Sequence, residues 1–283
     1  MSIRNVFLSS IILALIFFIS PVKAFGISPS KILLTIDSNT SQTVVLKINN
    51  SENKDLVFKL GVLGLKQDEN GKPVLGNGLT DAENWVYPEN KTISIKSGQT
   101  KTVNFILKVP DKTTPGSYYV GLFAESVGEV GARIVSLLTI QVAGVVNEGL
   151  LIEKWLPLKN SASSRERKFD LNLKNNGDVE VQLKSVVSVR NWKGEEIFAE
   201  PLVLGNKLLA GSRRALSPIV VLRDNVRLPG LYQSQIKINY GLTNQVSSAI
   251  AYFWFFPRWS QVFLIVFGIL IFGLVIFVVK RKK

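Results

Sequence analysis

The side chains best suited to chemistry in this sequence are carboxylates that occur in pairs. The pairs are Asp68 with Glu69, Glu125 with Glu129, and Glu195 with Glu196. Two carboxylates that face each other across a cleft can serve a wall hydrolase as its acid and base. Two of the pairs, however, flank Asn-Gly or Lys-Gly turns, where charged side chains are ordinarily solvated. We therefore predict that the chain has no catalytic residues.

The composition removes most other chemistry. The 283 residues include no histidine and no cysteine, which excludes Ser-His-Asp and Cys-His triads, disulfides, and zinc or haem sites built on those residues. The segment Asp68-Glu69-Asn70-Gly71 lacks the ligand spacing of a calcium loop. We expect no enzyme, no metal and no cofactor.

The N-terminus has the pattern of an export signal. Arg4 precedes an apolar stretch from Val6 to Ile19, and Val22-Lys23-Ala24 offers the small residues that signal peptidase requires. We predict a signal peptide over 1–24 with cleavage after Ala24. A retained anchor is the alternative, but the apolar stretch is short for a membrane span. Export without cysteine fits a bacterial or archaeal surface.

The C-terminus has the pattern of a membrane helix. The 18 apolar residues from Val262 to Val279 would span about 27 Å as a helix, close to a hydrocarbon core of about 30 Å. A buried core helix fits poorly, since it would end in four cations. We predict a transmembrane helix over 258–279, a basic cytoplasmic tail over 280–283, and an extracellular remainder. The predicted membrane-interface residues are Trp259, Lys280, Arg281, Lys282 and Lys283.

Between these ends, apolar and polar residues alternate with period two. The alternating stretches lie around 43–48, 102–109, 169–174, 179–184 and 236–240, and Asn-Gly, Lys-Gly and Pro-Gly turns separate them. Many short strands with frequent turns predict two tandem immunoglobulin-like antiparallel β-sandwiches, at 25–147 and 148–257.

The two predicted sandwiches repeat a short set of elements. Leu46-Lys47-Ile48-Asn49-Asn50 is echoed at 171–176, and Pro115-Gly116-Ser117-Tyr118 is echoed at 229–232. In each Pro-Gly-x-Tyr element we expect the turn to lead into a strand, with the ring in the core and the hydroxyl on a loop carbonyl. The first unit is longer, which predicts an added hairpin or long loop around its two Asn-Gly turns. Among Trp85, Trp155 and Trp192, we expect Trp192 to be the most exposed, because it precedes a Lys-Gly turn.

These motifs support a family resemblance. The positions Trp85, Pro88, 93–99, 103–105 and 109–116 resemble the first extracellular domain of WxL-interacting proteins, which is regarded as peptidoglycan-binding. The segments 175–179, 191–194, 209–214 and 229–232 resemble the second domain of that family, which is linked to host or surface partners. The order of signal, two β-domains, membrane helix and basic tail also matches. The chain departs from the family by being shorter, chiefly in its second domain.

The charge of +13 is unevenly distributed. Residues 25–147 carry 12 basic and 11 acidic side chains, whereas 148–259 carry 16 and 10. We predict no nucleic-acid partner, because much of the excess belongs to the two ends. The remainder predicts contact with an anionic surface, at Arg165, Arg167, Arg213 and Arg214, although a generally solvated basic surface is an equal alternative.

Two functions remain open. The first is a membrane-anchored surface protein that scaffolds or adheres by binding cell-wall polymer or other surface proteins. The second is a chaperone-like factor that assembles surface proteins through β-strand edges.

Overall fold

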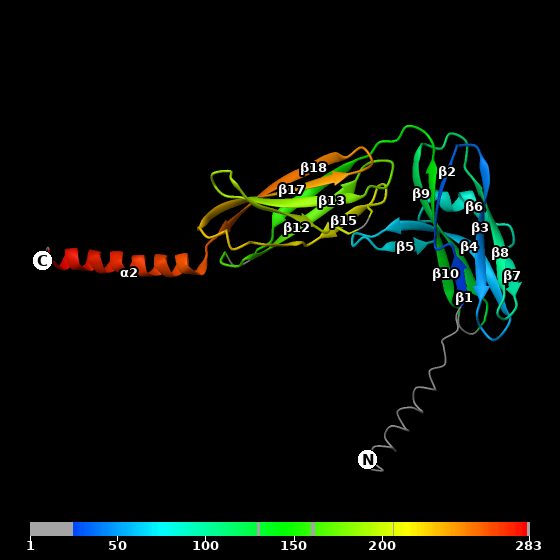
Figure 1. The fold of residues 1–283 in the computed structure, drawn as a ribbon, viewed down its shortest axis with the longest axis horizontal. Coiled ribbons are helices and arrows are strands. Elements are labelled where there is room, and N and C mark those ends of the chain that lie inside the picture. The colour runs from blue at the N-terminus through cyan, green and yellow to red at the C-terminus, as the bar shows by residue number, and fades with distance from the viewer. Residues whose placement is uncertain (1–24, 129–130, 160–161, 206, 282–283) are drawn as a thin grey trace, which may run out of the picture.

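The computed structural model describes residues 25–128, 131–159, 162–205 and 207–281. The predicted signal peptide with its cleavage site at Ala24, together with Glu129, Lys282 and Lys283, lies outside these ranges. Strands dominate the described residues, and the last element is a helix. Figure 1 shows two β-sandwiches in series, followed by that helix.

The first sandwich consists of two sheets. One has the order β1-β3-β8-β6, and the other has the order β2-β10-β9-β4-β5, with β7 also on β4. The strands are β1 Phe25–Ser28, β2 Lys31–Ile36, β3 Ser41–Asn50, β4 Leu56–Gln67, β5 Pro73–Gly76, β6 Val86–Pro88, β7 Thr92–Ile95, β8 Thr100–Lys108, β9 Gly116–Ser126 and β10 Arg133–Val142, and the 3-10 helix η1 covers Asp81–Trp85. All pairs are antiparallel except β2 with β10, which is parallel.

The second sandwich follows the same plan with fewer strands. The sheet β11-β12-β15, with β16 on β12, packs on the sheet β14-β13-β17-β18. The strands are β11 Leu150–Pro157, β12 Glu166–Asn175, β13 Leu183–Arg190, β14 Glu196–Leu202, β15 Arg213–Leu216, β16 Ile219–Val221, β17 Gly230–Tyr240 and β18 Gln245–Phe255. Each sandwich has its own buried apolar cluster, around Phe105 in the first and Phe169 in the second.

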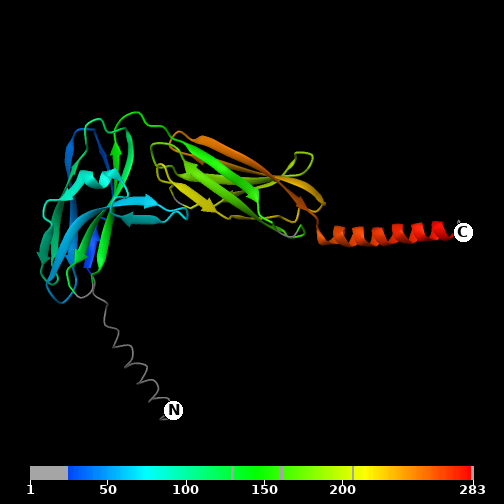
Figure 2. The ribbon, with the colours of Figure 1, turned by 180° about the vertical axis from the view of Figure 1, so that it is seen from behind.

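This sheet order is that of immunoglobulin-like sandwiches, so the predicted fold class is confirmed. The alternating patterns explain this fold class, because the inward residues of each strand fill the core and the outward residues face solvent. Figures 1 and 2 show the strands of the first sandwich running across the direction of those of the second, and the helix α2, Arg258–Arg281, continuing from the far end of the second.

The repeated asparagines have equivalent structural roles. The side-chain amide of buried Asn50 donates to the carbonyls of Lys54 at 2.9 Å and Ile95 at 3.0 Å. Buried Asn175 donates in the same way to Val179 at 2.8 Å and Leu208 at 2.9 Å. Each amide therefore ties the end of a strand to the following loop and to a more distant segment of its own sandwich.

The two tyrosines of the Pro-Gly-x-Tyr elements are also equivalent, and both follow the prediction. The hydroxyl of Tyr118 donates to the Thr114 carbonyl at 2.9 Å, and that of Tyr232 donates to the Leu228 carbonyl at 2.7 Å. Both rings pack against the core of their own sandwich. Each hydroxyl thus fixes the loop that enters the strand.

One predicted strand is wrong. The alternation of Val179, Val181 and Leu183 predicts a strand, but the structure has only an isolated bridge between Val181 and Leu208 before β13 begins. This segment connects a strand of one sheet to a strand of the other, so its alternation reflects side chains that enter the core without a ladder.

The predicted extra hairpin in the first sandwich exists and joins the two units. Strands β4 and β5 form it, and its tip extends toward the second sandwich (Figure 1). The Glu69 carbonyl at the tip accepts a hydrogen bond from the Ala215 amide at 2.7 Å. Gly71 there has φ +83°, and a Cβ on it would lie 2.9 Å from Nε of Arg214. The tip therefore requires glycine for both backbone geometry and space.

Candidate functional site

The four arginines predicted to contact an anionic surface do not form one site. Arg165 and Arg167 lie at the end of the second sandwich that carries α2, whereas Arg213 and Arg214 lie at the opposite end, beside the β4–β5 hairpin. The structure corrects the prediction for two of them, because Arg167 is 5% exposed and Arg214 is 3% exposed.

The two buried guanidinium groups donate hydrogen bonds to backbone carbonyls. Arg167 donates to the carbonyls of Ala162 at 2.8 Å and Trp254 at 3.0 Å. Arg214 donates to those of Leu204 at 3.0 Å and Lys207 at 2.8 Å. Desolvation lowers the pKa of both arginines. Sequence alone could not distinguish such a structural arginine from one on the surface.

The exposed pair is also engaged. Arg165 donates to the carbonyls of Leu222 and Arg223, and Arg213 forms an ion pair with Glu153 at 3.3 Å. Both side chains remain partly exposed, so anionic contact at Arg165 and Arg213 stays a prediction.

At the other predicted site, Trp259 lies on the first turn of α2 and is 56% exposed. The segment Arg258–Phe277 is long and apolar enough to cross a membrane, and nearly all of it is unburied. Lys280 and Arg281 belong to the last turn of the helix. By its length and composition, this helix is a candidate membrane span.

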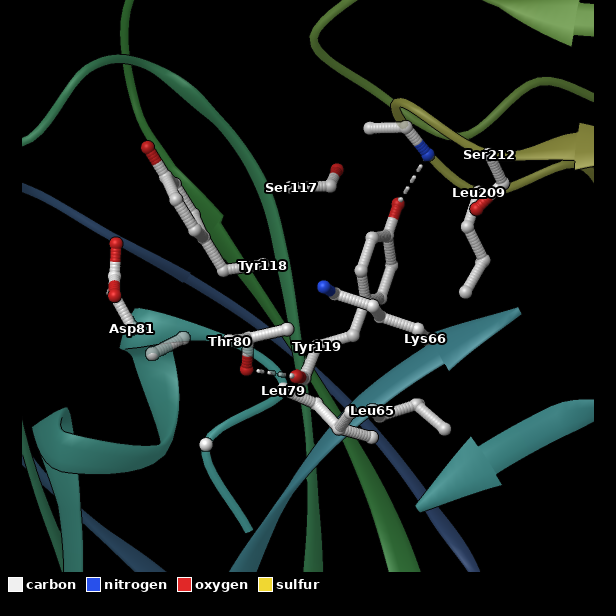
Figure 3. Close-up of a pocket in the computed structure, with 13 residues that line it drawn as sticks. Leu65, Lys66, Leu79, Thr80, Asp81, Ser117, Tyr118, Tyr119, Leu209 and Ser212 are labelled. Carbon is white, nitrogen blue, oxygen red and sulfur yellow. Dashed lines mark hydrogen bonds between the residues drawn. The ribbon is translucent and has the colours of Figure 1, made fainter. Parts of the chain in front are cut away.

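A pocket of about 360 Å³ lies where the two sandwiches meet (Figure 3). Its walls include Leu65 and Leu79 from the first sandwich and Leu209 from the second. The hydroxyl of Tyr119 points across it and accepts a hydrogen bond from the Ala210 amide at 3.3 Å. Burial is the main reason why the pKa of Tyr119 rises to about 12.

The residues around this pocket connect the two sandwiches. Asp81 is the one carboxylate among the described residues that line it, so no pair of carboxylates faces the space. The side chain of Gln67 further bridges the units, because its amide donates to the Lys207 carbonyl at 3.3 Å and its oxygen accepts from the Leu209 amide at 3.3 Å. Tyr119 and Gln67 both connect the sandwiches.

Two carboxylates from the predicted pairs make local contacts. Glu125 forms an ion pair with Arg133 at 2.6 Å, and the Asp68 carboxylate accepts the amides of Asn70 and Lys72 within its own turn. No cluster of acidic residues in the described ranges could hold a metal ion.

The most distinctive surface feature is the edge strand β18. An open sheet edge exposes unpaired N–H and C=O groups, and proteins usually protect such edges by shortness, charge, proline or a bulge. The other edge strands carry such protection. β1, β5, β6, β7, β15 and β16 have at most four residues, β2 begins with Lys31, β11 has a bulge at Ile152/Lys154, and β14 contains Glu196, Glu200 and Pro201.

β18 has no charge, proline or bulge, and β11 of the facing sheet lies alongside it without pairing to it. β18 covers the 11 residues Gln245–Phe255, contains no charged residue and no proline, and pairs with β17 in unbroken register. Its outward side chains are mostly large and apolar: Val246 is 59% exposed, Ile250 48%, Tyr252 58% and Trp254 57%.

The same residues present the open backbone groups. The Trp254 carbonyl accepts from Arg167 and the Phe256 amide donates to the Ala162 carbonyl, so even-numbered residues point away from β17. In an antiparallel strand the N–H and C=O of one residue point to the same side. No protein group in the described ranges bonds the outward backbone of Val246, Ser248, Ile250 and Tyr252. We call these four residues the open edge.

The sequence patterns did not reveal this open edge. The available signal was the absence of charge between Gln245 and Pro257. That signal can be interpreted only when the sheet order shows that β17 is the one strand hydrogen-bonded to β18 in the described residues.

Comparisons with known proteins assign no family. No family model matches the chain, and no curated protein matches it, so the resemblance to WxL-interacting proteins remains a prediction. Among solved structures, the chain is similar to the class 5 fimbriae chaperone CfaA, with 12% identity, a TM-score of 0.45, and coverage of 83% of this chain and 100% of that one.

A chain of the CsuC–CsuE chaperone–tip adhesion subunit pre-assembly complex, from archaic chaperone-usher Csu pili of Acinetobacter baumannii, has 13% identity and a TM-score of 0.43, with coverage of 81% and 98%. A PapD-like domain of human CEP192 has 13% identity and a TM-score of 0.31, and covers 45% of this chain. Likenesses of this strength carry no information about what this chain binds.

Proposed function

We propose that the chain is a non-enzymatic, membrane-anchored surface protein that binds extended segments of other surface polypeptides. The incoming segment adds as a strand to the open edge of β18. The observation that carries this proposal is an 11-residue edge strand without charge, proline or bulge. Strand addition supplies affinity through main-chain hydrogen bonds and specificity through alternate side chains.

The chemistry of the open edge favours a polypeptide over a wall polymer. Outward N–H and C=O groups recur at every second residue from Val246 to Tyr252. A β-strand presents complementary groups at the same spacing, whereas a sugar chain does not. Anchoring by α2 would keep the edge at the cell surface, where it can scaffold its partners or assist their assembly.

Photo-crosslinking in intact membranes tests the proposal. A photoreactive side chain in place of Ile250 should form an adduct with a surface polypeptide. The variant Tyr252→Lys should abolish that adduct, because it places a charge on the open edge. The matched control is Val57→Lys, on an exposed apolar position of β4 that is 40% exposed, and it should leave the adduct intact. Adducts that survive Tyr252→Lys would refute recognition at β18.

A further inference from the structure

We propose that the membrane-proximal end of the second sandwich is itself a bilayer-binding surface, formed by Trp192, Leu228 and Trp259, which we call the foot. This inference rests on the proposed membrane span of α2. The foot lies apart from the open edge of β18 and binds the polar–apolar boundary of the lipid bilayer.

Three segments converge to form the foot. Trp192 occupies the tip of the β13–β14 hairpin and is 68% exposed, and Leu228 lies in the loop before β17 and is 62% exposed. The indole N–H of Trp259 donates to the carbonyl of Arg227 at 3.3 Å, which joins that loop to the first turn of α2. A Cβ built on Gly230 would lie 3.9 Å from Cδ1 of Trp192, so the hairpin tip adjoins the same loop.

The segments of the foot are held in place. At the hairpin tip, the Asn191 side-chain oxygen accepts the amides of Lys193 at 2.9 Å and Glu195 at 3.0 Å. In the loop, the Leu228 carbonyl accepts the buried hydroxyl of Tyr232 at 2.7 Å. The hydrogen bonds within these turns therefore hold Trp192 and Leu228 in exposed positions.

The helix is equally fixed to the sandwich. Pro257 and Ser260 are buried at the start of α2, and the Phe256 amide donates to the Ala162 carbonyl at 2.8 Å. These contacts attach the start of the helix to the second sandwich. Both views of the chain show α2 leaving the end of the sandwich at which β18 terminates (Figures 1 and 2).

The depth of the foot follows from the helical rise. Trp259 precedes Val262, the first residue of the apolar stretch, by three positions, or about 4.5 Å along a helix. The headgroup layer adds roughly 5–7 Å on each side of the hydrocarbon core. Trp259 therefore falls within that layer, and we place Leu228 and Trp192 there too, because the loop 227–230 bonds Trp259 at one end and lies beside Trp192 at the other.

The chemistry of the foot matches this layer. Tryptophan favours the membrane interface, because its ring is apolar and its N–H is polar. Several charges around the foot are paired within the sandwich, Arg165 with Asp224 at 3.7 Å, Arg190 with Glu196 at 3.7 Å and Arg223 with Glu200 at 3.5 Å. Binding should therefore depend on insertion of apolar side chains and occur on zwitterionic as well as anionic lipid.

The absence of cysteine permits a direct test with single nitroxide labels on the full chain in phosphatidylcholine nanodiscs. Labels at Lys193→Cys and Arg227→Cys should show a higher ratio of oxygen to nickel-chelate accessibility than a label at Leu242→Cys, a residue 95% exposed at the other end of the sandwich. Adding Trp192→Ser to the Lys193→Cys chain should return that label to the value at 242. Nanodiscs that contain phosphatidylglycerol should give the same order of accessibility ratios among these labels.

A label at Phe267→Cys separates the two proposals. If that label is immersed while the labels at 193 and 227 match the one at 242, the foot is refuted and the membrane span stands. If the label at 267 is itself in water, the span is refuted and the foot with it.

Discussion

At the scale of single residues, the repeated asparagines make the most specific stabilising hydrogen bonds. Asn50 and Asn175 are fully buried, and each satisfies two carbonyls. A buried carbonyl left without a donor is expensive. We expect Asn50→Ala and Asn175→Ala each to lower the free energy of unfolding by roughly 2–4 kcal/mol, measured by urea denaturation of the full chain in detergent.

The neighbouring Asn49 provides the control for this prediction, since it is exposed and its amide bonds the Ser51 hydroxyl. Asn49→Ala should change stability by no more than about 0.5 kcal/mol. Equal effects of Asn49→Ala and Asn50→Ala would contradict the role assigned to the buried amide.

A second residue-scale prediction concerns pH. Burial raises the pKa of Tyr119 from 10.0 to about 12, so in this range the folded chain retains a proton that the unfolded chain loses. Its contribution to stability is therefore complete below pH 10 and is lost as the pH rises toward 12. Tyr119→Phe should make stability fall less steeply between pH 10 and 12 than in the parent. Identical slopes for Tyr119→Phe and the parent would contradict the assignment.

At the scale of elements, the direction of the backbone in β18 gives a matched pair of substitutions. The Ser248 amide points to the open edge, whereas the Ser247 amide points to β17. Proline is tolerated on an edge strand where its missing N–H faces outward. In thermal unfolding of the full chain, we expect Ser248→Pro to retain far more stability than Ser247→Pro. Equal losses would show that the edge has been assigned to the wrong residues.

The sequence predicted those elements whose pattern is local. Period-two alternation identified β3, β8, β12 and β17, and the Pro-Gly-x-Tyr elements predicted the tyrosine–loop contacts. It failed at Val179–Leu183, where alternation arises from a connection between sheets. It could not identify the open edge or the buried Arg167 and Arg214, because both depend on which distant segments become neighbours.

At the scale of the whole molecule, the two linkers should differ in their resistance to protease. Val145, between the sandwiches, is 91% exposed, whereas Pro257 and Ser260, between the second sandwich and α2, are buried. A broad-specificity protease acting on the full chain in nanodiscs should cut within 143–150 before 256–261. Mass spectrometry of the first fragments measures the order, and earlier cleavage at 256–261 would contradict the fixed attachment of the helix.

Under the proposed function, the molecule would hold the open edge at a set distance from the membrane. The β4–β5 hairpin, Gln67 and Tyr119 join the first sandwich to the second. The first sandwich therefore projects away from the end that carries α2 (Figure 1). A partner strand on β18 would lie between the first sandwich and the lipid surface.

Residue-resolved hydrogen exchange tests the central claim most directly, on the full chain with and without the crosslinked polypeptide. In the free chain, the amides of Ser247, Ala249 and Ala251 should be protected by β17, and those of Ser248, Ile250 and Tyr252 should exchange fast. In the complex, strand addition should protect the second set as well. If the open-edge amides still exchange fast in the complex, the partner does not bind as a strand on β18 and the proposed function is wrong.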